Sequence, residues 1–179
     1  MPLTDEYFTA DMVRALPDDG KRYELVHGEL LVTPAPRAQH QRIALWIVHL
    51  LIPYCERHAL GQPMVSPADI SWSPDTLVQP DVFVVAPEQA RAEWHAITSL
   101  RLVAEVLSPS TARQDRFAKR RLYQQQAVDT LWLVDAERRL VEVWAPEAVF
   151  PLIERERLIW QPVPATEPLH IDLVDLFNR

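Results

Sequence analysis

Two short apolar stretches of this sequence each contain an acidic residue, and they limit the folds that the chain can adopt. Residues 102–107 read LVAEVL and residues 80–85 read PDVFVV, so Glu105 and Asp81 interrupt runs that are typical of strands buried in a mixed sheet. A buried carboxylate is costly unless it is paired or hydrogen-bonded. If the two strands are adjacent, both acids project toward one spot and repel each other.

A cation between the two acids would relieve this repulsion. Oxygen ligands with no cysteine nearby suit Mg²⁺ or Mn²⁺ rather than zinc. Such an ion typically binds substrate phosphates and can activate a water molecule as a nucleophile. The residues alone leave an alternative open, in which each acid pairs with an arginine or caps a turn.

The pattern along the chain predicts an α/β fold in which helices flank a mixed sheet. RYELVHGELLV alternates around His27-Gly28 and predicts a hairpin with glycine at positive φ. Apolar spacing predicts a helix over residues 38–59, and Ser110 or Thr111 can cap another that runs to about Gln126. We expect strands at residues 68–73, 78–85, 100–107 and 151–160, two more around a turn at 136–138, and a short helix at 87–95.

Size and composition favour a soluble protein with one domain over residues 1–179. Cys55 is the only cysteine, which excludes an intramolecular disulfide and a thiolate metal cage and fits a reducing cytoplasm. The first residues carry acids where a secretory signal carries basic and then apolar residues, and the apolar window 43–55 is too short to span a bilayer. We therefore expect a cytoplasmic protein without a membrane partner, and a homodimer is a reasonable expectation.

The formal charge of -7 argues against a surface that grips nucleic acid all over. One segment is nevertheless basic, because five cations fall within nine residues against a single acid, Asp115. The cations are Arg113, Arg116, Lys119, Arg120 and Arg121. This segment is either a solvated helix face or a source of phosphate contacts, for which Arg113, Arg116 and Arg120 are candidates.

Lys119 and Asp115 share one face of the predicted helix with Leu122, which should point toward the sheet. A lysine near two carboxylates and a metal can position an attacking water or stabilise charge that develops on phosphate. The alternative is a surface ion pair between Asp115 and Lys119, which would contribute only a few tenths of a kcal/mol.

A resemblance to a known family rests on QPDVFVV, AEVLSPSTARQDRFAKRRLYQQQAV and TLWLVD, preceded by RYELVHGELLVTPAPRAQHQRIA. These segments resemble the bacterial Uma-two family of restriction endonuclease-like proteins, catalogued as a domain of unknown function, over roughly residues 5–175. That family is similar to the PD-(D/E)XK nuclease superfamily. The resemblance implies a restriction endonuclease-like mixed sheet flanked by helices, with additional β-hairpins, and acids that bind Mg²⁺ for phosphodiester hydrolysis.

Carried over by residue, the resemblance places the aspartate of the motif on Asp81 and its second acid on Glu105. The superfamily lysine would follow two residues later, where this chain has Leu107. In the resembling family the lysine lies on the following helix, which here means Lys119. Glu24 matches a further acid of the family and is a third candidate metal ligand, although a polar residue on a half-exposed hairpin explains it equally well.

His40, Gln41 and Tyr123 also match positions of the family. His40 can polarise phosphate or water, but a histidine that makes an ordinary hydrogen bond at a helix start is the simpler interpretation. Gln41 and Tyr123 can simply pack or form hydrogen bonds. We therefore assign none of the three a catalytic role from the sequence.

The sequence thus predicts a nuclease that depends on Mg²⁺ or Mn²⁺ and acts on nucleic acid, with DNA favoured. Its expected catalytic residues are Asp81, Glu105 and Lys119, and its expected metal ligands are Asp81, Glu105 and Glu24, with a backbone carbonyl at Val106 as a further donor. The alternative is a non-catalytic binding or assembly module that retains the nuclease fold, which the negative charge and Leu107 favour. A serine hydrolase or a nucleotide-binding loop is disfavoured because their glycine motifs are absent.

Overall fold

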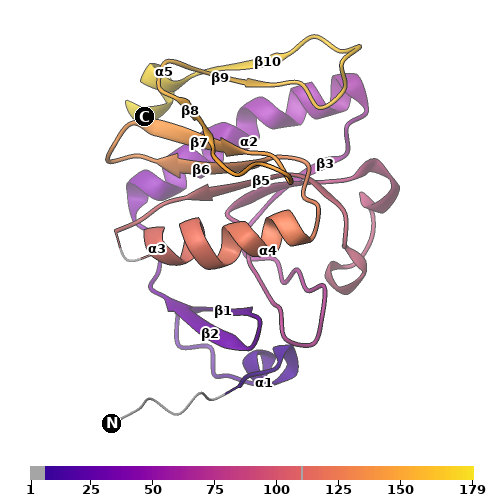
Figure 1. The fold of residues 1–179 in the computed structure, drawn as a ribbon, viewed down its shortest axis with the longest axis vertical. Helices are drawn as coiled ribbons and strands as arrows, with labels where there is room; N and C mark the ends of the chain where they lie inside the picture. The colour runs from indigo at the N-terminus through magenta and orange to yellow at the C-terminus, as the bar shows by residue number, and fades with distance from the viewer. Residues whose placement is uncertain (1–6, 110) are drawn as a thin grey trace.

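The computed structural model describes residues 7–109 and 111–179 and is built around a mixed sheet of six strands (Figure 1). In spatial order these are β3 (Gln62–Val65), β4 (Val82–Val85), β5 (Leu100–Val106), β6 (Leu131–Asp135), β7 (Leu140–Trp144) and β8 (Leu152–Glu154). Only the β5–β6 pair is parallel within this sheet. The predicted α/β fold with a mixed sheet flanked by helices is confirmed.

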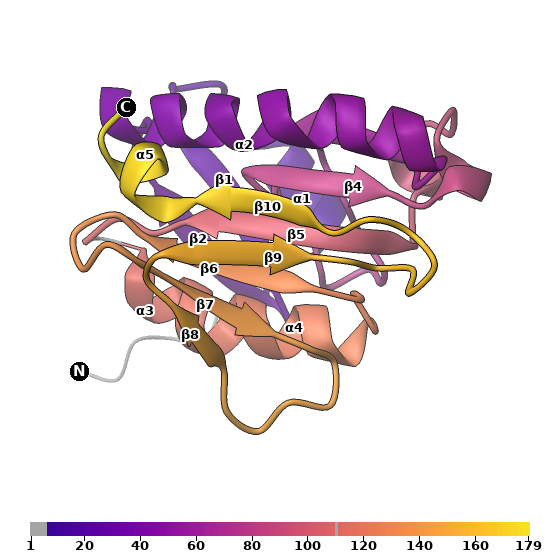
Figure 2. The same ribbon diagram turned by 90° about the horizontal axis from the view of Figure 1, so that it is seen from above.

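Helices cover both faces of the sheet. One face carries the long helix α2 (Ala38–His58), the hairpin of β9 (Arg157–Trp160) and β10 (Leu169–Asp172), and the short helix α5 (Leu173–Phe177) (Figures 1 and 2). The opposite face carries α3 (Ala112–Gln114), a π-helical turn η3 (Asp115–Lys119) and α4 (Arg120–Gln125). No helix in these described residues is long and apolar enough to cross a bilayer.

The first elements form a small unit beyond the α3–α4 face, at the end of the molecule away from β9 and β10 (Figure 1). This unit contains α1 (Ala10–Arg14) and the hairpin of β1 (Arg22–Val26) and β2 (Glu29–Thr33). His27 and Gly28 form the turn with φ of 51° and 81°, as the alternation around them predicts. Two 3₁₀ turns, η1 (Pro87–Gln89) and η2 (Trp94–Ala96), lie between β4 and β5.

Alternation of side chains along β4, β5 and β6 creates one apolar core on each face of the central sheet. The core on the α2 side includes Val82, Val84, Leu102, Ala104, Val106, Trp132 and Val134. The core on the α4 side includes Phe83, Val85, Val103, Leu131 and Leu133, together with Leu122 and Tyr123 of the helix. Glu105 belongs to the alternating series of Val103, and Asp81 precedes Phe83 by two residues, so both acids face the α3–α4 side.

Several expected elements differ in the structure. Residues 68–73 form no strand, because the hydroxyl of Ser71 donates to the carbonyl oxygens of Ser73 and Thr76 and so stabilises a local turn. Residues 151–160 form two strands, since a bend at 155–156 separates β8 from β9, which pairs with β10 instead. The helix expected at 87–95 is the pair of 3₁₀ turns. Thr111 is the N-cap residue of α3, and Ser110 lies outside the described residues.

The core on the α2 side provides a direct test of this architecture. Trp132 is fully buried and packs edge-on against Trp160, with ring centroids 6.2 Å apart. We expect Trp132→Ala to lower the free energy of unfolding by about 3 to 5 kcal/mol, because it leaves a large cavity. Phe150→Ala, at a side chain that is 82% exposed, should change it by no more than about 0.5 kcal/mol. Urea titration measures both values, and equal losses would contradict the described packing.

Candidate functional site

Pairing of β4 with β5 brings Asp81 and Glu105 together. Val82 pairs with Ala104 in this antiparallel ladder, so Asp81 and Glu105 follow as the next neighbours at the end of the pair. The backbone N–H of Val106 donates to Oδ2 of Asp81 at 2.9 Å. The two acids predicted from the sequence are therefore close in space, and both are buried.

Two side chains also contact the carboxylate of Asp81. Nη1 of Arg22 donates to Oδ1 at 2.8 Å, and Nε2 of His40 lies 2.9 Å from Oδ2. Burial alone would raise the pKa of Asp81, but the hydrogen bond from His40 and the charge of Arg22 outweigh it, so this pKa lies well below its usual range. Asp81 is thus held as a carboxylate.

Lys119 lies at the centre of three other carboxylates. Its Nζ is 2.8 Å from Oε1 of Glu105, 3.0 and 3.2 Å from the two oxygens of Glu24, and 3.3 Å from Oδ1 of Asp115. Only 3% of the lysine side chain is exposed, so the pair with Asp115 is buried and is not a surface ion pair. Burial would lower the pKa of Lys119, but the three carboxylates raise it well above its usual value. The amine therefore stays charged.

The π-helical turn explains how one helix face presents this lysine. Four residues advance about 40° beyond a full turn of an ordinary α-helix, so residues at 115, 119 and 123 would drift around its surface. A π turn contains more residues per turn and offsets this drift. As a result, Asp115, Lys119 and Tyr123 are all buried against the site.

Glu105 is surrounded by more negative than positive charge. It accepts a hydrogen bond from the hydroxyl of Tyr123 at 2.6 Å in addition to its contact with Lys119. Burial, and repulsion from Asp81, Asp115 and Glu24, nevertheless raise the pKa of Glu105 to about 8, although Lys119 lowers it. Most Glu105 side chains would therefore carry a proton at neutral pH when no cation is added.

These side chains line a pocket of about 210 Å³. Its charged walls are Arg22, Glu24, Asp81, Glu105, Asp115 and Lys119, and the exposed residues 34–37 and 137 belong to its rim. Four carboxylates face two permanent cations, which leaves an excess of two negative charges when all four are ionised. A divalent cation would neutralise this excess.

The pocket suits Mg²⁺ by its donor chemistry but is not arranged as a finished metal cage. Among residues 7–109 and 111–179, no three His, Cys, Asp or Glu side chains are grouped to hold an ion, and Arg22 and Lys119 lie among the acids. Mg²⁺, however, is commonly bound through only one or two carboxylates, with waters and substrate phosphates as its other ligands. Asp81 and Glu105 meet this requirement if Arg22 moves aside.

Sequence reasoning placed Asp81, Glu105, Lys119 and Glu24 at one site, and the structure brings these four residues to one pocket. It did not identify Arg22 as the partner of Asp81. The sequence did contain a signal for this contact, because side-chain alternation along β1 puts residue 22 on the same side as residue 24. Tyr123 and His40, left without catalytic roles, are the hydrogen-bond partners of Glu105 and Asp81.

The basic segment at residues 113–121 was a candidate source of phosphate contacts, but most of its candidate arginines contact the protein instead. Arg116 pairs with Asp135 and Glu142, each at 2.7 Å. Arg120 donates to the carbonyl of Arg116 and stacks over Trp144 at 4.4 Å from the ring centroid. Two of the three arginines proposed as phosphate contacts are thus engaged within the protein.

Comparison with known proteins bears on the fold and the family of this chain. A crystal structure from Anabaena variabilis, described as a putative nuclease belonging to DUF820, superposes with a TM-score of 0.77 at 22% identity, over 96% of this chain and 98% of that one. No curated protein sequence matches significantly. The sequence profile of the Uma2 family, described as putative restriction endonuclease, matches residues 10–170. This chain therefore belongs to the Uma2 restriction endonuclease-like family.

Proposed function

We propose that this chain is a metal-dependent nuclease that hydrolyses phosphodiester bonds of nucleic acid, with DNA the favoured substrate. The observation that carries the proposal is the buried contact between Lys119 and Glu105 at 2.8 Å. Position 107, two residues after the acid, holds a leucine that packs in the core on the α4 side. The amine of Lys119 reaches the same acid from the helix, which supplies the charge that Leu107 cannot.

Asp81 and Glu105 are the proposed ligands of one or two Mg²⁺ or Mn²⁺ ions, with Glu24 as a third candidate. Such an ion would offset negative charge on the reacting phosphate and lower the pKa of a water molecule. The contacts of Glu24 are with Lys119 and the backbone N–H of Gln79, at 2.8 Å for the latter. We therefore expect Glu24 to act mainly by holding the amine in place.

Hydrolysis forms a bond from a water oxygen to phosphorus, breaks the bond from phosphorus to one sugar oxygen, and leaves a proton on that oxygen. Lys119 would orient the attacking water and stabilise charge on the phosphate, because its ammonium group already lies against Glu105. Arg22 would leave Asp81 for a phosphate oxygen when substrate enters. His40 would keep Asp81 in its orientation.

A second candidate function is a binding or assembly module that keeps the fold without catalysis. Arg22 pairs with Asp81, and Lys119 lies among three other acids. These two protein cations neutralise part of the negative charge of the pocket, which supports the second candidate. In that case the protein cations are permanent and no ion binds. Metal titration separates the two candidates.

Calorimetric titration with Mn²⁺ should give a saturable binding isotherm for the wild-type protein. We expect Asp81→Asn and Glu105→Gln each to weaken binding at least tenfold, because removal of one carboxylate removes a ligand charge. Glu137→Gln is the matched control, since Glu137 lines the same pocket but is exposed at its rim. A wild-type protein that binds neither Mn²⁺ nor Mg²⁺ would leave only the non-catalytic module.

Cleavage assays should compare single-stranded, duplex and branched substrates in Mg²⁺. We expect Asp81→Asn and Glu105→Gln to lose activity, and Glu24→Gln to lower kcat by roughly tenfold or more while metal affinity changes little. Glu137→Gln should cleave like the wild type. Equal cleavage by wild type and both acid variants would identify a contaminant and refute the assignment.

The raised pKa of Glu105 predicts a pH-dependent loss of stability in the metal-free protein. Between about pH 5 and about pH 8 the folded state holds a proton on Glu105 that the unfolded chain has released, so its contribution to stability falls as the pH rises. Glu105→Gln cannot titrate. Urea unfolding in a chelator should therefore show the variant gaining stability relative to the wild type toward pH 8, and Mg²⁺ should restore the wild type. If the difference in unfolding free energy between the variant and the wild type does not change with pH, the raised pKa of Glu105 is contradicted.

A further inference from the structure

Exposed residues on the α3–α4 helix form a row that the pocket does not use. Arg113, Phe117 and Arg121 recur at four-residue intervals, and all three are exposed, whereas Asp115, Lys119 and Tyr123 face inward. Phe117 is 58% exposed and has no ring partner among the described residues. We call Arg113, Phe117 and Arg121 the outer ridge.

The two arginines of the outer ridge differ from Arg116, which lies between them in the sequence, in their contacts with acids. Arg116 is bound by Asp135 and Glu142, whereas neither Arg113 nor Arg121 forms an ion pair with a described residue. Their charge is presented on a protein whose formal net charge is -7. A local basic strip can attract a polyanion to an otherwise acidic protein.

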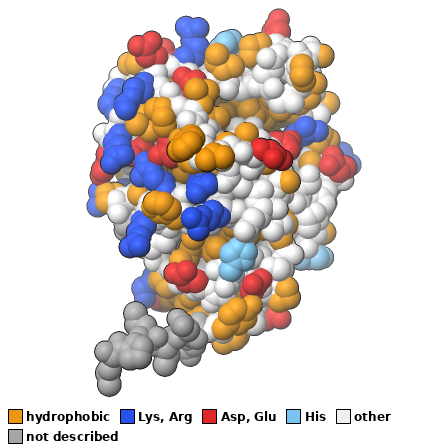
Figure 3. All heavy atoms as spheres, viewed as in Figure 1, with side chains coloured by type: hydrophobic (Ala, Val, Ile, Leu, Met, Phe, Trp, Pro, Cys, Tyr) orange, Lys and Arg blue, Asp and Glu red, His pale blue; other side chains and the backbone are white. Residues whose placement is uncertain are grey.

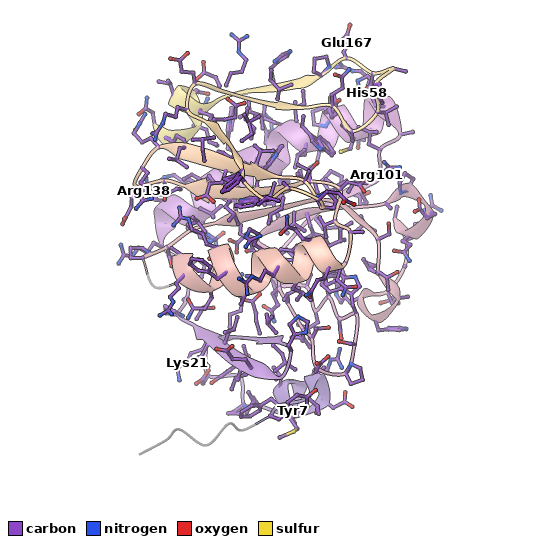
Figure 4. The ribbon with its side chains drawn as sticks, viewed as in Figure 1. Tyr7, Lys21, His58, Arg101, Arg138 and Glu167 are labelled. Atoms are coloured by element: carbon purple, nitrogen blue, oxygen red, sulfur yellow. The ribbon has the colours of Figure 1, made fainter. Side chains whose placement is uncertain are left out.

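The ridge begins near the pocket. Thr111 lines the pocket, and Arg113 follows it by two residues at the start of the helix. From residue 113 to residue 121 the helix rises about 12 Å, which is the length of about three to four stacked nucleotides. Lys and Arg side chains gather on the side of the molecule where α3 begins, where Arg138 also lies (Figures 3 and 4). A strand leaving the pocket can therefore follow the ridge.

The chemistry of the ridge fits a strand with unstacked bases. An exposed aromatic ring offers a platform on which a base can stack, and flanking arginines contact the phosphates on either side of that nucleotide. In a duplex the base faces are already covered by their neighbours, so the ring would gain little. Stacking also needs no particular base, because every base has a π-face.

We propose that the outer ridge binds single-stranded nucleic acid, with Phe117 stacking on a base and Arg113 and Arg121 contacting its flanking phosphates. This assignment rests on the proposed nuclease function and specifies its substrate as one with an unpaired segment beside the scissile bond. The ridge would hold the segment that extends from the pocket. Phe117 is thereby a specificity-determining residue outside the catalytic pocket.

The test measures binding without cleavage. Fluorescence anisotropy in a chelator would follow labelled single-stranded DNA, single-stranded RNA and duplex DNA of matched sequence. We expect the wild type to prefer single strands, and Phe117→Ala to weaken that binding by about fivefold to about a hundredfold while leaving duplex binding unchanged. Arg113→Ala and Arg121→Ala should each lower the slope of log affinity against log salt by about 0.7.

Arg57→Ala and Phe150→Ala are the matched controls, because both side chains are exposed but lie outside the ridge. Arg57 is next to His58, which Figure 4 places on the opposite side of the molecule from Arg138. Thermal unfolding should show that every variant folds, since all the substituted side chains are exposed. The DNA and RNA arms identify which single strand is preferred.

Single-strand binding that is absent in the wild type, or unchanged in Phe117→Ala, would overturn the ridge assignment. Equal losses on single strands and duplex would also overturn it, because stacking on unpaired bases would then not be the cause. Failure of the nuclease proposal is distinguishable, because the protein would then neither bind Mn²⁺ or Mg²⁺ nor cleave nucleic acid. Intact single-strand binding in the chelator would still support the ridge in that case.

Discussion

The buried ammonium group of Lys119 is the interaction on which the rest of the site depends. Three carboxylates from separate elements, Glu24 on β1, Glu105 on β5 and Asp115 on the helix, lie within 3.3 Å of it. A charge removed from water is costly unless it is paired, and breaking such a pair leaves uncompensated charge in the interior. The lysine therefore ties the N-terminal hairpin, the central sheet and the crossover helix to one point.

The fold explains why these groups meet. The β4–β5 pairing puts the two acids side by side, alternation turns both toward the helix, and the parallel β5–β6 connection makes the intervening chain cross that same face. The π-helical turn then keeps Asp115, Lys119 and Tyr123 in line over Glu105. Because the pocket holds more acid than base when its four carboxyl groups are ionised, an added cation would lower the repulsion among them.

Much of this arrangement could be predicted from the sequence. The acids inside apolar runs, the hairpin at His27-Gly28 and the helix that carries Lys119 follow from local patterns, because strand burial and turn chemistry are local properties. The resemblance to a family supplied the choice of Lys119 over position 107. Pairing between distant segments was harder to foresee, and the Arg22–Asp81 ion pair became visible only when β1 was placed beside the end of β4.

The differences from the expected elements have separate physical causes. Residues 68–73 have the composition of a strand, but hydroxyl groups of Ser71 and Thr76 bond the nearby backbone and compete with a ladder. The length of α3–α4 was predictable from apolar spacing, whereas its π turn was not, because a single inserted residue leaves that spacing almost unchanged. The engagement of Arg116 by Asp135 and Glu142 was also not predictable, because it depends on contacts between distant segments.

The central proposal is that Asp81 and Glu105 bind a divalent ion together, and that Arg22 leaves Asp81 when the ion binds. A crystal of this chain soaked with Mn²⁺ and measured for anomalous scattering tests it most directly. The account predicts a peak between these two carboxylates, with Arg22 turned away from Asp81 and Lys119 still against Glu105. An absence of anomalous density there, with the Arg22–Asp81 pair intact at saturating Mn²⁺, would contradict it.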